Sequence, residues 1–150
     1  MAQSLARLHV HIVFSTRARQ ALLHERVRGA LHAYLAKVLQ NLGCRPVLIN
    51  SVEDHVHLLV DLARTVSVSE ALEEIKKWSS KWIKTQGAEF AGFAWQGGYG
   101  AFAVSESKLE AVRAYIANQR EHHRSEAFQD EYRTLLGEEG VAYDEQYLWD

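Results

Sequence analysis

Two segments of the chain alternate between apolar and polar residues, and this pattern most restricts what the chain can fold into. They cover residues 7–16 and 55–62. The apolar positions are Leu8, Val10, Ile12 and Phe14 in the first segment, and Val56, Leu58, Val60 and Leu62 in the second. Alternation with a period of two predicts a strand that buries one face.

Each alternating segment begins a strand–helix–strand unit. After the first, an amphipathic helix is predicted over 25–42 and a short strand over 46–52. After the second, the capping box Ser67–Glu70 opens a helix, and a strand follows around 100–104. Two right-handed units in this order predict an α+β fold with a ferredoxin-like, split strand-helix-strand antiparallel sheet.

The predicted topology separates the two faces of the sheet. The first and third strands are central, and the helices of both units cover one face. The apolar sides of the central strands would meet these helices, and their histidines would point to the opposite, open face. A second capping box at Ser107–Glu110 predicts an additional helix that runs to about His123, and the polar remainder is expected to be helical over 126–136.

Length and composition indicate one folded domain over residues 1–150. Hydrophobic residues make up 47% of the chain and charged residues 24%, as in ordinary globular proteins. Cys44 is the single cysteine, which excludes a disulfide framework and a cysteine-based zinc site and favours a reducing, cytoplasmic location. No apolar stretch approaches the roughly 20 residues that cross a bilayer, so no membrane partner is expected.

Charge divides the chain into a mildly basic core and an acidic extension. Residues 121–150 hold nine acidic and two basic residues, whereas residues 1–120 hold 15 basic and 10 acidic ones. We therefore expect a core over about 7–123 and an acidic C-terminal extension over about 124–150. A basic core is compatible with a polyanionic partner, although a solvated mixed-charge surface explains the same numbers.

Two His-x-His patterns, at His9 and His11 and at His55 and His57, fall on the predicted central strands. Residues i and i+2 of a strand share a face, so each pair of imidazoles can hold one cation. Histidines on such strands are more often polar surface or hydrogen-bonded core. The patterns alone leave both interpretations open.

The additional helix carries Tyr115 and Gln119, one turn apart on one face. A tyrosine at the border of an apolar stripe commonly packs its ring and exposes its hydroxyl. The functional alternative is a phenolic nucleophile beside an amide metal ligand. Spacing alone favours a tyrosine that packs at the border of the apolar stripe.

The combination of these motifs resembles the single-tyrosine transposases of the HUH (His–hydrophobic–His) superfamily, which occur in small insertion sequences and in association with repetitive extragenic palindromes. The resemblance covers residues 7 to 120. It rests on Asp54-His55-Val56-His57-Leu58-Leu59-Val60, Tyr115-x-x-x-Gln119, His11-Ile12-Val13-Phe14-Ser15-Thr16 with Arg17 and Arg19, and Trp95-Gln96-Gly97-Gly98-Tyr99 before Val104-Ser105-Glu106.

The resemblance implies a homodimeric enzyme that cuts and rejoins single-stranded DNA at element ends marked by hairpins. By this resemblance, His55, His57 and Gln119 hold a divalent cation, Mg²⁺ or Mn²⁺, which polarises the scissile phosphate. Tyr115, on the additional helix, would attack that phosphate, form a 5′-phosphotyrosine link and release a 3′-hydroxyl. The covalent link retains the bond energy for rejoining.

Basic residues in two places are expected to contact the DNA. They are Arg17 and Arg19 after the first strand, and Lys76, Lys77, Lys81 and Lys84 on the second helix.

Two alternative functions remain. A non-catalytic ferredoxin-like nucleic-acid-binding protein, such as a domesticated relative, is disfavoured because such modules display aromatic residues where this sheet displays histidines. A metal-dependent phosphodiesterase would use water and leave Tyr115 structural. A covalent protein–DNA adduct would distinguish the transposase from both.

Overall fold

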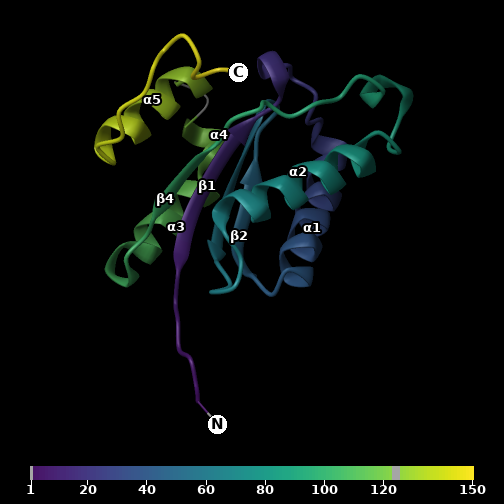
Figure 1. Cartoon of the computed structure of the whole chain (residues 1–150). Coiled ribbons are helices and arrows are strands. Elements are labelled where there is room, and N and C mark those ends of the chain that lie inside the picture. The colour runs from purple at the N-terminus through teal and green to yellow at the C-terminus, as the bar shows by residue number, and fades with distance from the viewer. Residues whose placement is uncertain (1, 123–125) are drawn as a thin grey trace.

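Four antiparallel strands form one sheet in the order β2-β3-β1-β4 (Figure 1). The computed structural model describes residues 2–122 and 126–150. Strands β1 (His9–Ser15) and β3 (His55–Asp61) are central, and β2 (Arg45–Ser51) and β4 (Gly100–Ala103) form the edges. The predicted ferredoxin-like strand order is confirmed.

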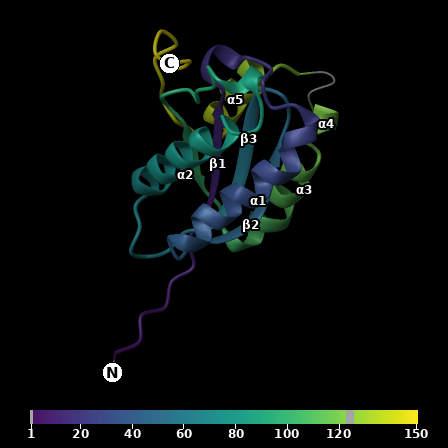
Figure 2. The ribbon, with the colours of Figure 1, turned by 90° about the vertical axis from the view of Figure 1, so that its right-hand side faces the viewer.

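Helices α1 (Glu25–Asn41) and α2 (Val68–Ile83) cover one face of the sheet (Figure 2). The apolar sides of β1 and β3 pack against them, as the alternation predicts. The main core includes Ile12, Phe14, Val56, Leu58, Leu31, Leu35, Leu72 and Ile75, all at most 2% exposed. Burial of these side chains supplies the main driving force for the fold.

The ends of the first two helices follow their sequence signals. Gly43 adopts a φ of 80° just after α1, a conformation that glycine tolerates without a steric penalty. The Ser67 side chain accepts a hydrogen bond from the Glu70 N–H and caps α2.

The second predicted capping box is wrong. A 3₁₀ turn, η3 (Glu106–Lys108), precedes α3 (Leu109–Ala117), whose N-cap residue Lys108 makes no side-chain cap. The Ser107 hydroxyl instead contacts the Ser105 hydroxyl at 3.1 Å. The 3₁₀ turn moves Ser107 away from the start of the α-helix.

The additional helix is also interrupted. Asn118, with φ −97° and ψ 23°, separates α3 from α4 (Gln119–His122), so Tyr115 and Gln119 lie on consecutive helices. The Asn50 side chain donates hydrogen bonds to the Ile116 carbonyl at 2.8 Å and the Ala117 carbonyl at 3.3 Å. This tertiary contact satisfies the last carbonyls of α3. The predicted end at His123 lies outside the described residues.

The prediction of an open histidine face is wrong. Helices α3, α4 and α5 (Phe128–Glu138) lie on that face, opposite α1 and α2 (Figures 1 and 2). Helix α5 buries Phe128, Tyr132 and Leu136 in a second cluster with Val13 and Phe102. The acidic extension therefore carries an apolar stripe at helical spacing and folds onto the sheet.

The remaining short elements are η1 (Arg17–Arg19), after β1, and η2 (Ala88–Phe90), between α2 and β4. None of the described helices is long and apolar enough to cross a membrane.

Candidate metal and nucleophile site

Strand β3 places His55 and His57 side by side on the face opposite α1 and α2. Their register partners on β1 are Ser15 and Val13. Both imidazoles are completely buried, whereas the intervening Val56 enters the main core. The strand alternation thus presents both rings to the same site.

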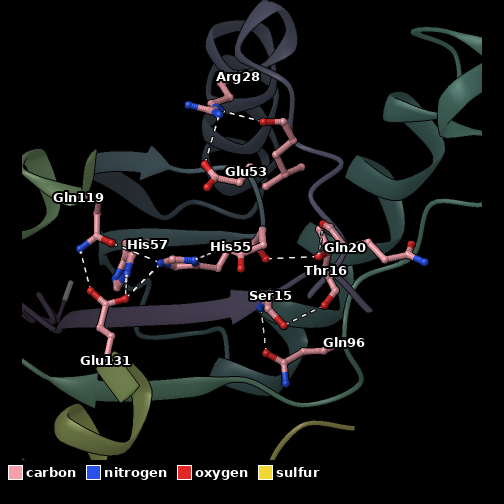
Figure 3. A network of polar contacts seen from close by, with 12 residues as sticks. Ser15, Thr16, Gln20, Arg28, Glu53, His55, His57, Gln96, Gln119 and Glu131 are labelled. Atoms are coloured by element: carbon pink, nitrogen blue, oxygen red, sulfur yellow. Dashed lines mark hydrogen bonds and ion pairs between the residues drawn. The ribbon is translucent and has the colours of Figure 1, made fainter. Parts of the chain in front are cut away.

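His55 is held from both ring nitrogens (Figure 3). Its Nδ1 lies 2.7 Å from Asp54 Oδ1, and its Nε2 lies 3.1 Å from Glu131 Oε1. Burial opposes the charged ring, but the hydrogen bonds to Asp54 and Glu131 outweigh burial and raise the pKa of His55. Asp54 orients the ring and leaves Nε2 facing the site.

His57 is held by a different pair of neighbours. Its Nδ1 lies 2.8 Å from His11 Nε2, and its Nε2 lies 3.2 Å from Glu131 Oε1. Burial, with the nearby His57, lowers the pKa of His11 to about 3, so the His11 ring is neutral. A buried imidazole therefore supports His57, where a carboxylate supports His55.

Gln119 reaches the same site from the start of α4. Its Oε1 lies 3.3 Å from His55 Nε2, and its Nε2 donates to Glu131 Oε2 at 3.2 Å (Figure 3). The residue is fully buried. The structure thus brings Gln119 to the histidine pair despite the helix break at Asn118.

Glu131 of α5 lies at the centre of this cluster and was missed from the sequence. It is 2% exposed, and its two oxygens contact His55, His57, Gln119 and Tyr115. A signal was present: Glu131 stands next to Tyr132 and one turn from Phe128, within the apolar stripe of α5. An acid buried within such a stripe requires polar partners.

Tyr115, on α3, points its hydroxyl into the same cluster. The hydroxyl donates a short hydrogen bond to Glu131 Oε2. The ring centroid lies 5.8 Å from that of His57 and 6.2 Å from that of His11. Burial and the Glu131 carboxylate raise the pKa of Tyr115, so the phenol is protonated in this arrangement.

The donor set fits a divalent cation. His55, His57 and Glu131 form a buried group able to hold a metal ion. Metal–ligand bonds of about 2.1 Å place adjacent ligand atoms of an octahedral site about 3.0 Å apart. The distances from His55 Nε2 to Glu131 Oε1 (3.1 Å), from His57 Nε2 to Glu131 Oε1 (3.2 Å) and from His55 Nε2 to Gln119 Oε1 (3.3 Å) are close to this value.

The two His-x-His patterns diverge in the structure. His9 is buried, and its Nδ1 lies 3.4 Å from Glu106, whereas its Nε2 has no hydrogen-bond partner among the described residues. His11 contacts His57 of the second pattern. The first pattern therefore supplies one neighbour of the site and no second metal group within the described ranges.

Arg17 and Arg19 lie in η1, immediately after β1. Ala18 and Arg19 both adopt positive φ, 55° and 56°, which is uncommon outside glycine. Arg17 is exposed, and the Arg19 guanidinium lies 5.6 Å from the Trp149 ring centroid. The turn thus contacts the end of the acidic extension.

Helix α2, which carries Lys76, Lys77 and Lys81 and is followed by Lys84, lies on the face of the sheet opposite α3 and α5 (Figure 2). These lysines line a groove of about 430 Å³ with residues 93–97. Lys76 differs from the others because its ammonium donates to the carbonyls of Gln96 and Gly98, at 2.9 and 2.8 Å. Burial lowers its pKa to about 8. Lys76 therefore anchors the loop, while Lys77, Lys81 and Lys84 are exposed.

Comparison with known proteins identifies the family of this chain and finds solved structures with a similar fold. The family model described as "Transposase IS200 like" matches residues 4–119. A crystal structure of a protein assigned as a transposase from Deinococcus radiodurans R1 is similar, with a TM-score of 0.62, 22% identity, and coverage of 79% of this chain and 98% of that one. A REP-associated tyrosine transposase bound to a REP hairpin is similar with a TM-score of 0.61, 16% identity, and coverage of 82% and 74% respectively. No curated protein matches the chain.

A ferredoxin-like sheet, a His–hydrophobic–His pair on a central strand and a tyrosine on the helix after the fourth strand together define the HUH single-tyrosine class of transposases. The family match spans most of the chain, and the protein belongs to the IS200-like transposase family. It is an enzyme of DNA transposition.

Proposed function

We propose that this transposase cleaves and rejoins single-stranded DNA through a 5′-phosphotyrosine intermediate formed on Tyr115. The observation that carries the proposal is the convergence of the Tyr115 hydroxyl with His55, His57 and Gln119 around the Glu131 carboxylate. A nucleophile adjacent to a metal-binding group is the arrangement that phosphoryl transfer requires.

In the proposed reaction, a bond forms between the Tyr115 oxygen and the scissile phosphorus as the bond from phosphorus to the 3′-oxygen breaks. The Tyr115 hydroxyl, released from Glu131 Oε2 when the scissile phosphate displaces that carboxylate, gives its proton to solvent. The departing 3′-oxygen takes a proton from solvent. A divalent cation, Mg²⁺ or Mn²⁺, held by His55, His57 and Gln119, would polarise the phosphate. Rejoining is the reverse step with a new 3′-hydroxyl.

Hairpin-marked DNA is the proposed partner. A structural neighbour was solved bound to a REP hairpin, and the folds are similar over 82% of this chain. The exposed Arg17 and the lysine-lined groove on α2 offer basic surface for phosphates. We also propose a homodimer, by resemblance to the family.

Access of DNA to the site requires α5 to move. The imidazoles of His55 and His57 are completely buried, and the Phe128 ring stacks on His55 at 4.4 Å between centroids. The Glu131 carboxylate also occupies the position beside both Nε2 atoms that a phosphate oxygen would need. The Glu131 carboxylate and the scissile phosphate would repel each other strongly if both lay in this buried, low-dielectric site. In the proposed cycle, the scissile phosphate therefore displaces Glu131 from the imidazoles.

Loosening α5 should accelerate cleavage. Leu136→Ala removes a buried side chain of α5 from the second apolar cluster, and loss of its packing should cost about 2–5 kcal/mol. We expect faster amide exchange in α5 and a several-fold higher rate of adduct formation, measured by hydrogen exchange and gel assay. Leu135→Ala, at the partly buried edge of the same cluster, is the matched control. It should change amide exchange and the rate of adduct formation less than Leu136→Ala does. Faster amide exchange in α5 with an unchanged cleavage rate would show that undocking of α5 does not limit the reaction.

Gln119 should contribute to metal binding and not to DNA binding. Gln119→Ala removes the oxygen beside His55 Nε2, and we expect an Mn²⁺ requirement about 10-fold higher and slower adduct formation. Gln119→Glu should bind Mn²⁺ at least as well but cleave more slowly, since added negative charge repels the phosphate. The rate of adduct formation, measured across an Mn²⁺ titration for wild type and the two variants, checks both expectations. If the alanine variant follows the wild type throughout, Gln119 is not a ligand.

The proposed function itself is tested by trapping the intermediate. The full chain is incubated with single-stranded hairpin DNA and Mn²⁺, separated on a denaturing gel, and any adduct is mapped by mass spectrometry. An adduct on Tyr115 supports the transposase mechanism. Cut DNA without an adduct would show hydrolysis by water, and hairpin binding without cleavage would show a non-catalytic protein.

A further inference from the structure

We propose that His11 is a positioning residue that fixes the tautomer and orientation of His57 for metal binding. The inference rests on the proposed function, because it assumes that His57 Nε2 is a metal ligand. It concerns a residue of a neighbouring strand that does not touch the metal position itself.

The contact between the two rings defines where a proton must lie. His11 Nε2 and His57 Nδ1 are 2.8 Å apart, and the rings are stacked with an interplanar angle of 23° and centroids 5.0 Å apart. Two bare nitrogens would repel at this distance, and two N–H groups would clash. One nitrogen therefore carries a hydrogen and the other accepts it.

Metal binding selects one of these two arrangements. A cation needs the lone pair of His57 Nε2, the atom that faces Glu131 Oε1. A neutral imidazole that binds through Nε2 keeps its single proton on Nδ1. His57 must then donate from Nδ1, and His11 Nε2 is the acceptor. A partner on the second nitrogen of a ligand histidine commonly fixes ring orientation in metal sites.

The sheet explains why His11 performs this role and His9 does not. His57 pairs with Val13 across the strands, so His11 is its diagonal neighbour on the same face. His9 pairs with Asp61, at the far end of the register, and contacts Glu106 instead. Both histidines are almost fully buried, at 5% and 4% exposed for His9 and His11. Their different positions along β1 thus decide their roles.

The two ligand histidines would then be supported differently. Asp54 supplies a carboxylate to His55 Nδ1, whereas His11 supplies a neutral acceptor to His57 Nδ1. A second carboxylate at this place would add negative charge to a buried site that must admit a phosphate. A neutral acceptor orients His57 without that charge.

The test measures metal binding on the full-length protein without DNA. Mn²⁺ affinity is determined by calorimetry for wild type, His11→Phe, His11→Gln and the matched control His9→Phe. The phenylalanine keeps a flat ring beside His57 but cannot accept a hydrogen bond, whereas the glutamine oxygen can. We expect His11→Phe to weaken Mn²⁺ binding about 10- to 100-fold, His11→Gln to restore most of the affinity, and His9→Phe to match wild type.

A tautomer measurement separates positioning from general damage to the fold. With Zn²⁺ bound, ¹⁵N NMR of the His57 ring should report a proton on Nδ1 in wild type and in His11→Gln. Wild-type Mn²⁺ affinity in His11→Phe, or no rescue by His11→Gln in a protein with an unchanged urea midpoint, would overturn the role of His11. If wild type forms a Tyr115 adduct while His11→Phe keeps full Mn²⁺ affinity, the proposed function stands and only this inference fails. If the metal results are as expected but no adduct forms, the proposed function fails instead.

Discussion

Replacing Tyr115 with phenylalanine should abolish the covalent DNA adduct. The substitution removes one oxygen, the atom that donates to Glu131 Oε2, and keeps the ring that packs near His57 and His11. No other atom of the side chain can attack phosphorus, so the adduct should fall below detection. DNA binding should persist, because phosphate binding depends on basic groups elsewhere. A denaturing gel measures the adduct, and a gel-shift assay measures binding.

The other tyrosines provide the controls for this experiment. Tyr132 is buried on α5 in the second apolar cluster, and Tyr143 and Tyr147 are exposed in the C-terminal segment. Phenylalanine at Tyr132, Tyr143 or Tyr147 should leave the adduct in place. An adduct that survives in Tyr115→Phe, or that maps to one of these three residues, would show that the nucleophile has been assigned wrongly.

Replacing His57 with alanine should eliminate metal-dependent cleavage, whereas His9→Ala should have a modest effect. His57 Nε2 contacts Glu131 Oε1 within the group able to hold a metal, and His9 lies outside that group. Loss of a supporting contact alone costs about 10- to 100-fold in metal affinity, so loss of a ligand should cost at least the upper value. Mn²⁺ affinity and adduct yield measure the difference.

The comparison of these two variants also controls for burial. Both histidines are almost fully buried on the same face of the sheet, so both substitutions leave a comparable cavity. Urea unfolding should therefore show similar destabilisation of the two variants. Equal loss of cleavage in His9→Ala and His57→Ala would mean that the loss reflects the cavity and not a ligand role.

Glu131 changes the charge expected at the metal position. The ligands implied by resemblance, two imidazoles and one amide, are all neutral. With α5 docked on the sheet, the Glu131 carboxylate lies beside them. A carboxylate would hold a cation firmly but repel an incoming phosphate. Departure of α5 would restore the neutral set. In the proposed cycle, the acidic extension therefore sets when the site can admit DNA.

The local sequence determined the four strands and the first two helices. Alternation in β1 and β3 assigned His55 and His57 to one face because side chains of a strand point to opposite sides in turn. Helical spacing gave α1 and α2, and Ser67 marked where α2 begins. These features depend on neighbours within a few residues, and such periodicities can be read directly from the chain.

Only the tertiary structure decided which groups meet at the site. Glu131 lies 74 residues from His57, and its helix docks there because Phe128, Tyr132 and Leu136 find an apolar surface at Val13 and Phe102. At the break before α4, the last carbonyls of α3 accept hydrogen bonds from Asn50 of strand β2. The separate roles of His9 and His11 depend on the register of β1 against β3. Each of these contacts joins segments far apart in sequence, and no local pattern encodes the register or docking that brings such segments together.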